Sequence, residues 1–219
     1  MKAVSYTLWG DNPKYCVGAV KNAEGCAIFY PGWTPVFFYA PDVPHHYLDE
    51  IVSKNPKSLL IEKNAFPSWV SVLWRLEIID QEDVEMAIFR DTDSRISDRE
   101  VAAVNEWVNS EKMAHIMRDH PQGHGQAIMP GMLGLKKGAI NDAKGLIEKF
   151  GGSDHYGTDY TFFNTIIYPL ISHNALVHDD FFEKKPFPTP RNGLEFVGQV
   201  FDELDNPNQE HAHSLGRFL

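Results

Sequence analysis

The sequence predicts an α/β fold with a mostly parallel central sheet flanked by helices. Short apolar runs of strand length alternate along the chain with longer segments whose apolar residues have helical spacing, and clusters of Gly, Pro, Asn and Asp separate them. The chain has 219 residues, 43% of them hydrophobic, which is enough for the core of one large domain. Because no linker or internal repeat divides it, we expect residues 1–219 to form a single domain.

The first half of the chain is predicted to alternate strands and helices. Dense turn signals mark the ends of the first two elements, at Gly10-Asp11-Asn12-Pro13 and at Pro31-Gly32. Between residues 48 and 61 the pattern does not separate a helix from a strand. The elements predicted for this half are strands at 3–9, 34–39 and 84–89 and helices at 15–29 and 66–79.

The second half begins with a strong helix start signal. Ser97 and Glu100 have the spacing of a capping box, and apolar residues follow at helical spacing from Val101. The further elements predicted here are strands at 115–118 and around 128–135 and helices at 141–150 and 159–171. The tail from Pro186 onward is rich in Pro, Gly and Asn, and we expect it to wrap around the domain.

Charge and composition narrow the classes of partner and compartment. The formal net charge of -10 argues against nucleic acid or an anionic membrane as a partner, but not against an anionic small molecule held through a metal ion. Cys16 and Cys26 are predicted to be free thiols in a reducing compartment. No apolar run approaches the roughly 20 residues that span a bilayer. We therefore expect a cytoplasmic protein without a transmembrane segment.

Two acidic residues, Asp91 and Asp93, follow the apolar run that ends at Phe89 and precede the helix that begins near Ser97. They are therefore expected in a loop at the carboxyl end of a strand. In α/β sheets ligands bind at this edge.

This D-x-D pattern allows four interpretations. A calcium-binding EF-hand is excluded, because Ile96 and Ala102 stand where its glycine and glutamate are required. A phosphatase would use Asp91 as its nucleophile, but Arg95 replaces the threonine usual two residues after the second aspartate. A solvated turn would pair the acids with neighbouring arginines. A divalent-cation site that presents a diphosphate is the fourth possibility, since hard cations prefer carboxylate and phosphate oxygens.

Further polar clusters are weaker signals by themselves. The segment HIMRDHPQGH, residues 115–124, contains three histidines and an aspartate, but their spacing matches no standard zinc motif. The segment VHDDFFEKKPFP, residues 177–188, combines His178 with a lysine pair. Asp159 begins an apolar helix, where an acid also complements the helix dipole.

The order of these segments resembles the GT-A class of nucleotide-sugar glycosyltransferases, particularly the glycogenin-like and lipopolysaccharide galactosyltransferase-like family. LWGDNPKY, residues 8–15, resembles its nucleoside-contacting stretch, and Arg75 matches the arginine on the helix before its D-x-D loop. Asp159-Tyr160 approximates its later D-Q pair, and HDDFFEKKPF, residues 178–187, its H-x-x-G-x-x-K-P-W motif. The chain also resembles, nearly end to end, a family of short bacterial and viral glycosyltransferase-like proteins with FRD-x-DSR, H-I-M-R-D-H-P and F-V-G-Q segments.

The resemblance implies a GT-A domain with a Rossmann-like nucleotide-binding part at about 1–95 and an acceptor part at about 96–219. It implies Mn²⁺ or Mg²⁺ as cofactor, a UDP- or GDP-sugar as donor and a glycan as acceptor. The donor contacts it implies are Leu8, Trp9, Gly10, Asp11, Asn12, Tyr15, Arg75, Arg90, Asp91, Lys184 and Lys185. The metal ligands it implies are Asp91, Asp93 and His178, and the candidate catalytic acids are Asp159 and Asp179.

In such a reaction the metal acts as a Lewis acid on the diphosphate leaving group. A lysine at 184 or 185 would add positive charge to the same group. Asp159 would orient or deprotonate the acceptor hydroxyl, and an inverting reaction would require this base or Asp179. A Mg²⁺-dependent phosphatase and a non-catalytic carbohydrate-binding module remain as alternatives from the sequence.

Overall fold

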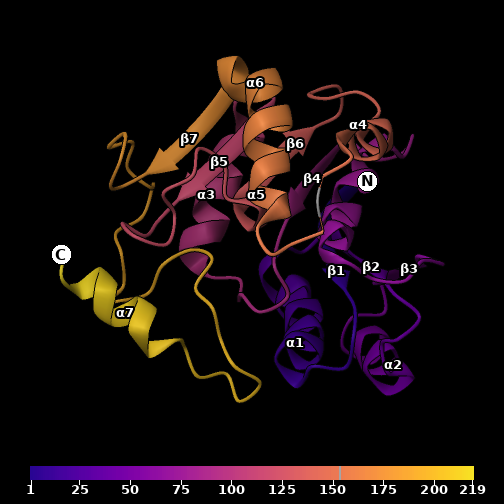
Figure 1. Cartoon of the computed structure of the whole chain (residues 1–219). Helices are drawn as coiled ribbons and strands as arrows, with labels where there is room; N and C mark the ends of the chain where they lie inside the picture. Colours follow the sequence, from indigo (N-terminus) through magenta and orange to yellow (C-terminus); the bar gives the residue numbers. More distant parts are fainter. Residues whose placement is uncertain (153) are drawn as a thin grey trace.

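A seven-stranded mixed sheet forms the centre of the computed structural model, which describes residues 1–152 and 154–219 (Figure 1). The strand order is β3-β2-β1-β4-β6-β5-β7, and only the two pairings of β6, with β4 and with β5, are antiparallel. The strands are β1 (Lys2–Leu8), β2 (Trp33–Tyr39), β3 (Leu59–Glu62), β4 (Met86–Phe89), β5 (Ala114–Arg118), β6 (Leu133–Lys136) and β7 (Ala175–Asp179). The prediction of a mostly parallel α/β sheet is therefore confirmed.

Helices cover both faces of this sheet. Side chains alternate between the two faces along each strand, and both faces carry apolar side chains that must be buried. Val4, Tyr6 and Leu8 of β1 pack on one face, whereas Ala3 belongs to the core on the other face. The first face is covered by α1 (Pro13–Phe29), α2 (His45–Lys54) and α3 (Asp98–Asn109). The second is covered by η1 (Trp69–Asp80), α4 (Ala143–Phe150), α5 (Thr158–Phe162) and η3 (Phe163–Ile167), which continues into α6 (Tyr168–Ile171). The other helical segments are η2 (Pro130–Met132), η4 (Ser172–Asn174) and α7 (Gln209–Gly216).

Two predicted helices differ in their geometry from regular α-helices. The segment predicted at 66–79 is the 3₁₀ helix η1, whose backbone is bonded by β1: the Arg75 N–H donates to Thr7 Oγ1 (3.1 Å) and Ser5 Oγ donates to the Arg75 carbonyl (2.8 Å). These bonds join η1 to β1 at that residue. The segment predicted at 159–171 contains a π-helical turn, η3, just before Pro169, which lacks an N–H and clashes with a regular helical turn.

The strand predicted around residues 128–135 begins later than expected. Pro130 starts the short 3₁₀ turn η2, and pairing with β4 begins only at Leu133. Proline removes a backbone donor from a ladder, so the strand starts after it. None of the helices in the described part of the chain is long and apolar enough to cross a membrane.

The C-terminal segment returns to the loop that follows β4 (Figure 1, yellow). Val200 forms an isolated antiparallel bridge with Ser94, and the Phe201 N–H donates to the Asp93 carbonyl at 2.8 Å. Arg95 Nε forms an ion pair with Asp205 Oδ1 at 2.9 Å. The tail therefore supports the D-x-D loop from outside.

A buried ion cluster around Asp119 holds the tail in this position. Asp119 has no solvent exposure and accepts bonds from Arg99 Nε (2.9 Å), Arg191 Nη2 (2.5 Å) and the Val197 N–H (2.9 Å). Arg191 and Val197 lie in the tail, whereas Arg99 belongs to α3. The aspartate of the HIMRDHP segment thus has a structural role.

We expect Asp119→Ala to lower the free energy of unfolding by about 3–5 kcal/mol, because it removes the fully buried carboxylate that two buried guanidinium groups share and leaves them only the partly exposed Asp180. Urea unfolding followed by circular dichroism measures this loss. Asp49→Ala, an exposed position on α2, should change it by no more than about 0.5 kcal/mol. A loss below about 1 kcal/mol for Asp119→Ala would contradict the structural role.

Candidate functional site

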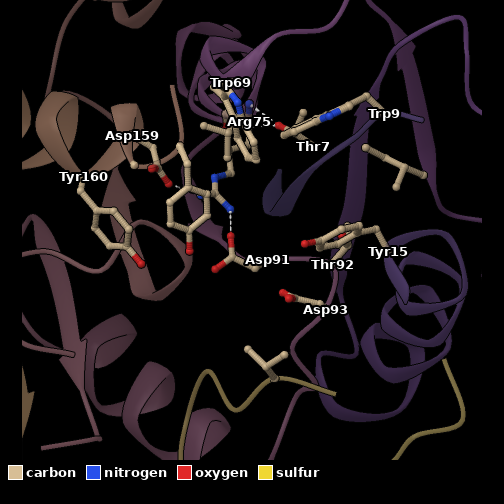
Figure 2. A pocket seen from close by; sticks show the side chains of 15 residues that line it. Thr7, Trp9, Tyr15, Trp69, Arg75, Asp91, Thr92, Asp93, Asp159 and Tyr160 are labelled. Carbon is tan, nitrogen blue, oxygen red and sulfur yellow. Dashed lines mark hydrogen bonds and ion pairs between the residues drawn. The ribbon is translucent and has the colours of Figure 1, made fainter. Parts of the chain in front are cut away.

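A cleft of about 290 Å³ opens at the carboxyl ends of β1 and β4 (Figure 2). The chain runs from β1 to β2 on one side and later returns to β4 on the other side of β1. Such a reversal of strand order leaves a crevice between the outgoing loops, where α/β sheets bind ligands. The cleft is lined by Thr7, Leu8, Trp9, Tyr15, Trp69, Val72, Arg75, Asp91, Thr92, Asp93, Tyr156, Gly157, Asp159, Tyr160 and Val200.

The D-x-D loop is held against α1 by contacts that residues of this helix make with the backbone of the loop. Asn22 Nδ2 donates to the carbonyls of Thr92 (3.0 Å) and Ser94 (2.9 Å). Gly18 on the same helix leaves space for the Thr92 carbonyl, which would lie 2.1 Å from any Cβ at that position. The loop is therefore rigidly placed, and its two acidic side chains are free to face the cleft.

Each aspartate of the loop faces a cationic side chain. Asp91 Oδ1 lies 2.5 Å from Arg75 Nη1, and Asp93 Oδ2 lies 2.7 Å from Lys14 Nζ. Burial, followed by the negative charge of Asp91, raises the pKa of the Asp93 carboxyl above its ordinary value, despite the opposing effect of Lys14. The negative charge of this pair is thus incompletely compensated, a situation that a bound cation relieves.

Arg75 has unused hydrogen-bonding capacity. Its side chain is almost fully buried, and its Nε and Nη2 atoms have no hydrogen-bond partner in the part of the chain that the structure describes. Buried unpaired N–H groups are costly, and an anionic ligand in the cleft would satisfy them. Nη2 lies 3.9 Å from Asp159 Oδ2, so Arg75 stands between Asp91 and Asp159 (Figure 2).

Asp159 lies in the first turn of α5, on the opposite side of Asp91 from Tyr15 (Figure 2). Burial raises the pKa of its carboxyl, and the positive charge of Arg75 partly opposes this shift. A carboxylate with a raised pKa is a stronger base than an ordinary aspartate.

The structure brings seven of the predicted site residues together. These are Leu8, Trp9, Tyr15, Arg75, Asp91, Asp93 and Asp159. Gly10, Asp11 and Asn12 form the adjoining turn but do not line the cleft. Gly10 has a positive φ of 70° and donates its N–H to Asp42 Oδ1, and Asn12 caps α1.

Arg90 was predicted as a donor contact, but its side chain points into the core. Its Nε donates to Glu100 Oε1 at 2.8 Å, and Tyr30 Oη donates to the same oxygen. This pairing also explains why the predicted capping box is only half formed: Ser97 accepts from the Glu100 N–H, while the Glu100 side chain turns to Arg90. A buried guanidinium requires a carboxylate partner, so the Glu100 side chain pairs with Arg90 instead of completing the helix cap.

His178 was predicted as a metal ligand, but the structure does not bring it to the two aspartates. It lies on β7, three strand spacings or about 14 Å from β4 across the sheet. Its Nδ1 is 2.8 Å from His115 Nε2, and its Nε2 is 3.5 Å from Glu106 Oε2. Among the described residues no three His, Cys, Asp or Glu side chains are grouped to hold a metal ion, so the predicted three-ligand set is not assembled.

The other predicted residues near β7 also lie outside the cleft. Asp179 is fully buried, accepts the N–H groups of Phe181, Phe182 and Glu183, and pairs with Arg118, so it shapes a turn. The side chains of Lys184 and Lys185 are exposed, and Lys185 pairs with Glu183. These residues lie outside the cleft for the same reason as His178, because β7 is three strands away from β4 in the sheet.

Several residues in or beside the cleft were not identified from the sequence. Lys14, which pairs with Asp93 at the edge of the cleft, could have been found, because it lies in the first turn of the helix that follows β1. Trp69, Tyr156 and Val200 carry no such signal, since each is brought to the cleft by a distant part of the chain.

Comparisons with known proteins identify the fold. No family model matches the chain, and no curated protein matches its sequence. An active-site mutant of LgtC superposes with a TM-score of 0.53 over 82% of this chain and 73% of that chain, at 13% identity. The mannosyltransferase PcManGT from Pyrobaculum calidifontis, in complex with GDP-Man and Mn²⁺, superposes with a TM-score of 0.54 over 82% of this chain and 55% of that chain, at 15% identity.

The fold is of the GT-A type. A GT-A fold does not by itself give the activity, because proteins with different reactions share it. The 4-diphosphocytidyl-2C-methyl-D-erythritol synthase from Anaerococcus prevotii DSM 20548 superposes with a TM-score of 0.51 over 87% of this chain and 92% of that chain, at 10% identity. The argument for function therefore depends on the cleft residues of this chain.

Proposed function

We propose that this protein is a metal-dependent glycosyltransferase that moves a sugar from a nucleoside-diphosphate sugar to a hydroxyl group of a glycan or another acceptor. One observation carries the proposal: a GT-A cleft holds a D-x-D carboxylate pair, the cationic side chain of Arg75 and a separate carboxylate with a raised pKa, and Lys14 pairs with Asp93 at its edge. These are the groups needed to hold a metal, a diphosphate and an acceptor hydroxyl, respectively.

The two aspartates suit Mn²⁺ or Mg²⁺. These cations are often held by one or two carboxylates together with substrate phosphates, so no third protein ligand is required. The raised pKa of Asp93 supports this fit, because a cation would stabilise its ionised form. When bound, the metal would act as a Lewis acid toward the leaving diphosphate. Asp93 would be a direct ligand, and Asp91 would share the metal or hold the ribose hydroxyls.

Arg75 and Lys14 would bind the diphosphate. The unpartnered N–H groups of Arg75 favour an anion in the cleft, and Lys14 brings an ammonium group to within 2.7 Å of Asp93. They replace Lys184 and Lys185 in the role expected from the sequence. Positive charge at this place stabilises the transition state, in which negative charge builds up on the leaving group.

The nucleoside and the acceptor would occupy opposite sides of Asp91. Leu8, Trp9 and Tyr15 at the end of β1 offer apolar and aromatic surface to a base. Asp159 faces Asp91 from the other side and would orient, or in an inverting reaction deprotonate, the acceptor hydroxyl (Figure 2). Asp179 has no part in this proposal, because its oxygens are occupied by backbone N–H groups.

A thermal-shift screen of UDP- and GDP-sugars, each with and without Mn²⁺, tests the proposal. A ligand that binds only the folded state stabilises it by about 2.7 kcal/mol at a hundredfold excess over Kd. We expect at least one nucleotide sugar to raise the melting temperature with Mn²⁺ and to do so much less without it. No shift with any nucleotide sugar would refute the proposal, and labile phosphorylation at Asp91 would favour a phosphatase instead.

A further inference from the structure

Two exposed aromatic side chains form one wall of the cleft, and the proposed reaction does not yet use them. Trp69 is 45% exposed and Tyr156 is 76% exposed, although both are large and largely apolar. Their ring centroids are 5.4 Å apart and their planes are nearly perpendicular, at 89°. This pair, called here the aromatic wall, lines the cleft together with Arg75 and Asp159.

Backbone contacts fix the positions of the two segments that carry the aromatic wall. Trp69 is the first residue of η1, where Ser68 caps the helix, and its N–H donates to Asp154 Oδ1 at 2.6 Å. That bond joins the two distant segments that carry the rings. Gly157, with a positive φ of 86°, allows the sharp turn between Tyr156 and α5. An ordered platform loses little entropy when a ligand binds to it.

The aromatic wall adjoins the groups assigned to the acceptor. Trp69, Arg75 and Asp159 line the same cleft, and Asp159 lies on the same side of Asp91 as Tyr160, away from Trp9 and Tyr15 (Figure 2). Tyr156 is three residues before Asp159 on the same segment. The nucleoside has its own aromatic contacts at the end of β1, so this second aromatic surface is available to another ring.

We propose that Trp69 and Tyr156 form the acceptor subsite and that the acceptor is a saccharide, whose terminal ring stacks on one of these perpendicular rings and is flanked by the other; this inference rests on the proposed function. The C–H face of a sugar ring is apolar and slightly positive, and it is attracted to the negative face of an aromatic ring. The hydroxyl groups at its edge can donate to Asp159. A lipid acceptor would need a long apolar groove, whereas this cleft of about 290 Å³ carries four charged side chains besides Lys14 at its edge.

The inference is tested with methyl glycosides of glucose, galactose and mannose in the presence of Mn²⁺ and UDP or GDP. Saturation-transfer NMR measures which glycoside binds and which of its protons contact the protein. We expect Trp69→Ala and Tyr156→Ala each to weaken glycoside binding roughly tenfold, as expected for loss of a stacking partner. Nucleoside diphosphate binding, measured by calorimetry, should change less than about twofold.

Phe66→Ala provides the matched control. Phe66 is 99% exposed, lies three residues before Trp69 and does not line the cleft, so its loss should leave glycoside binding unchanged. If the nucleotide binds but no glycoside does, or if the two variants bind glycosides as well as the wild type, the inference is overturned. Equal losses of nucleotide and glycoside binding would assign the wall to the donor and overturn it too. Failure of the wild type to bind any nucleotide would instead remove the proposed function, and the inference with it.

Discussion

Replacing Asp93 with asparagine should abolish the Mn²⁺-dependent binding of a nucleoside diphosphate while leaving the fold intact. The side chain lies in the cleft rather than in the core, and its only ion pair in the described residues is with Lys14. An amide cannot neutralise a divalent cation, and few other oxygen ligands are at hand to compensate. Calorimetric titration of UDP or GDP with and without Mn²⁺ measures the effect.

The same substitution should not destabilise the protein. Because burial and the charge of Asp91 raise the pKa of Asp93, its ionised form costs folding free energy at neutral pH, and that cost disappears as the pH falls through the raised pKa. Asparagine carries no charge, so Asp93→Asn should melt at neutral pH no lower than the wild type. Asp49→Asn removes an equal charge from an exposed site on α2 and should retain full metal-dependent binding. Unchanged Mn²⁺-dependent binding in Asp93→Asn would refute the assignment.

Replacing Asp159 with asparagine should slow sugar transfer by roughly 10²–10⁴-fold, the loss typical of an acid–base group. Donor binding should change far less, because Asp159 lies across Asp91 from the nucleoside side of the cleft (Figure 2). Two quantities are compared between the variant and the wild type: kcat for sugar transfer from one donor, and Kd for the nucleoside diphosphate. Equal losses in both would make Asp159 a donor contact, and a slowing of less than about tenfold would exclude it as the base.

The pH dependence of the reaction gives a second measurement on the same residue. Asp159 must be ionised to accept a proton, so the rate should fall as the pH decreases through its pKa, which burial places above the ordinary aspartate value. This acid limb should be absent from the residual activity of Asp159→Asn. An unchanged limb in the variant would show that another group titrates.

The part of the site predicted from local pattern alone is the D-x-D loop, which depends on short-range order. The apolar run that ends at Phe89 becomes β4, and Asp91 and Asp93 follow it at the sheet edge as predicted. Leu8, Trp9 and Tyr15, which the family resemblance implied, also line the cleft at the end of β1 and the start of α1. A buried strand, a turn and a helix start are determined by neighbouring residues, so their order along the chain also gives the edge at which their loops lie.

The errors concern residues whose position depends on the order of strands within the sheet. His178 follows an apolar run as convincingly as Asp91 does, but β7 lies at the far edge, beyond β6 and β5. His178 therefore meets His115 and Glu106, and no local pattern distinguishes that outcome from metal binding. Arg90 is a similar case, because a buried acid on α3 draws its side chain into the core.

By itself, the amino-acid sequence determined the α/β class, most of the element boundaries and the loop that carries Asp91 and Asp93, because each of these follows from periodicity, turn residues and caps within a few residues. Only the tertiary structure decided which side chains share the cleft. Lys14 meets Asp93 because α1 packs against the loop that follows β4, Trp69 meets Tyr156 from a distant part of the chain, and the tail reaches the D-x-D loop through the Asp119 cluster. Such contacts depend on how elements that are distant in the sequence pack against one another, and local sequence patterns do not specify that packing.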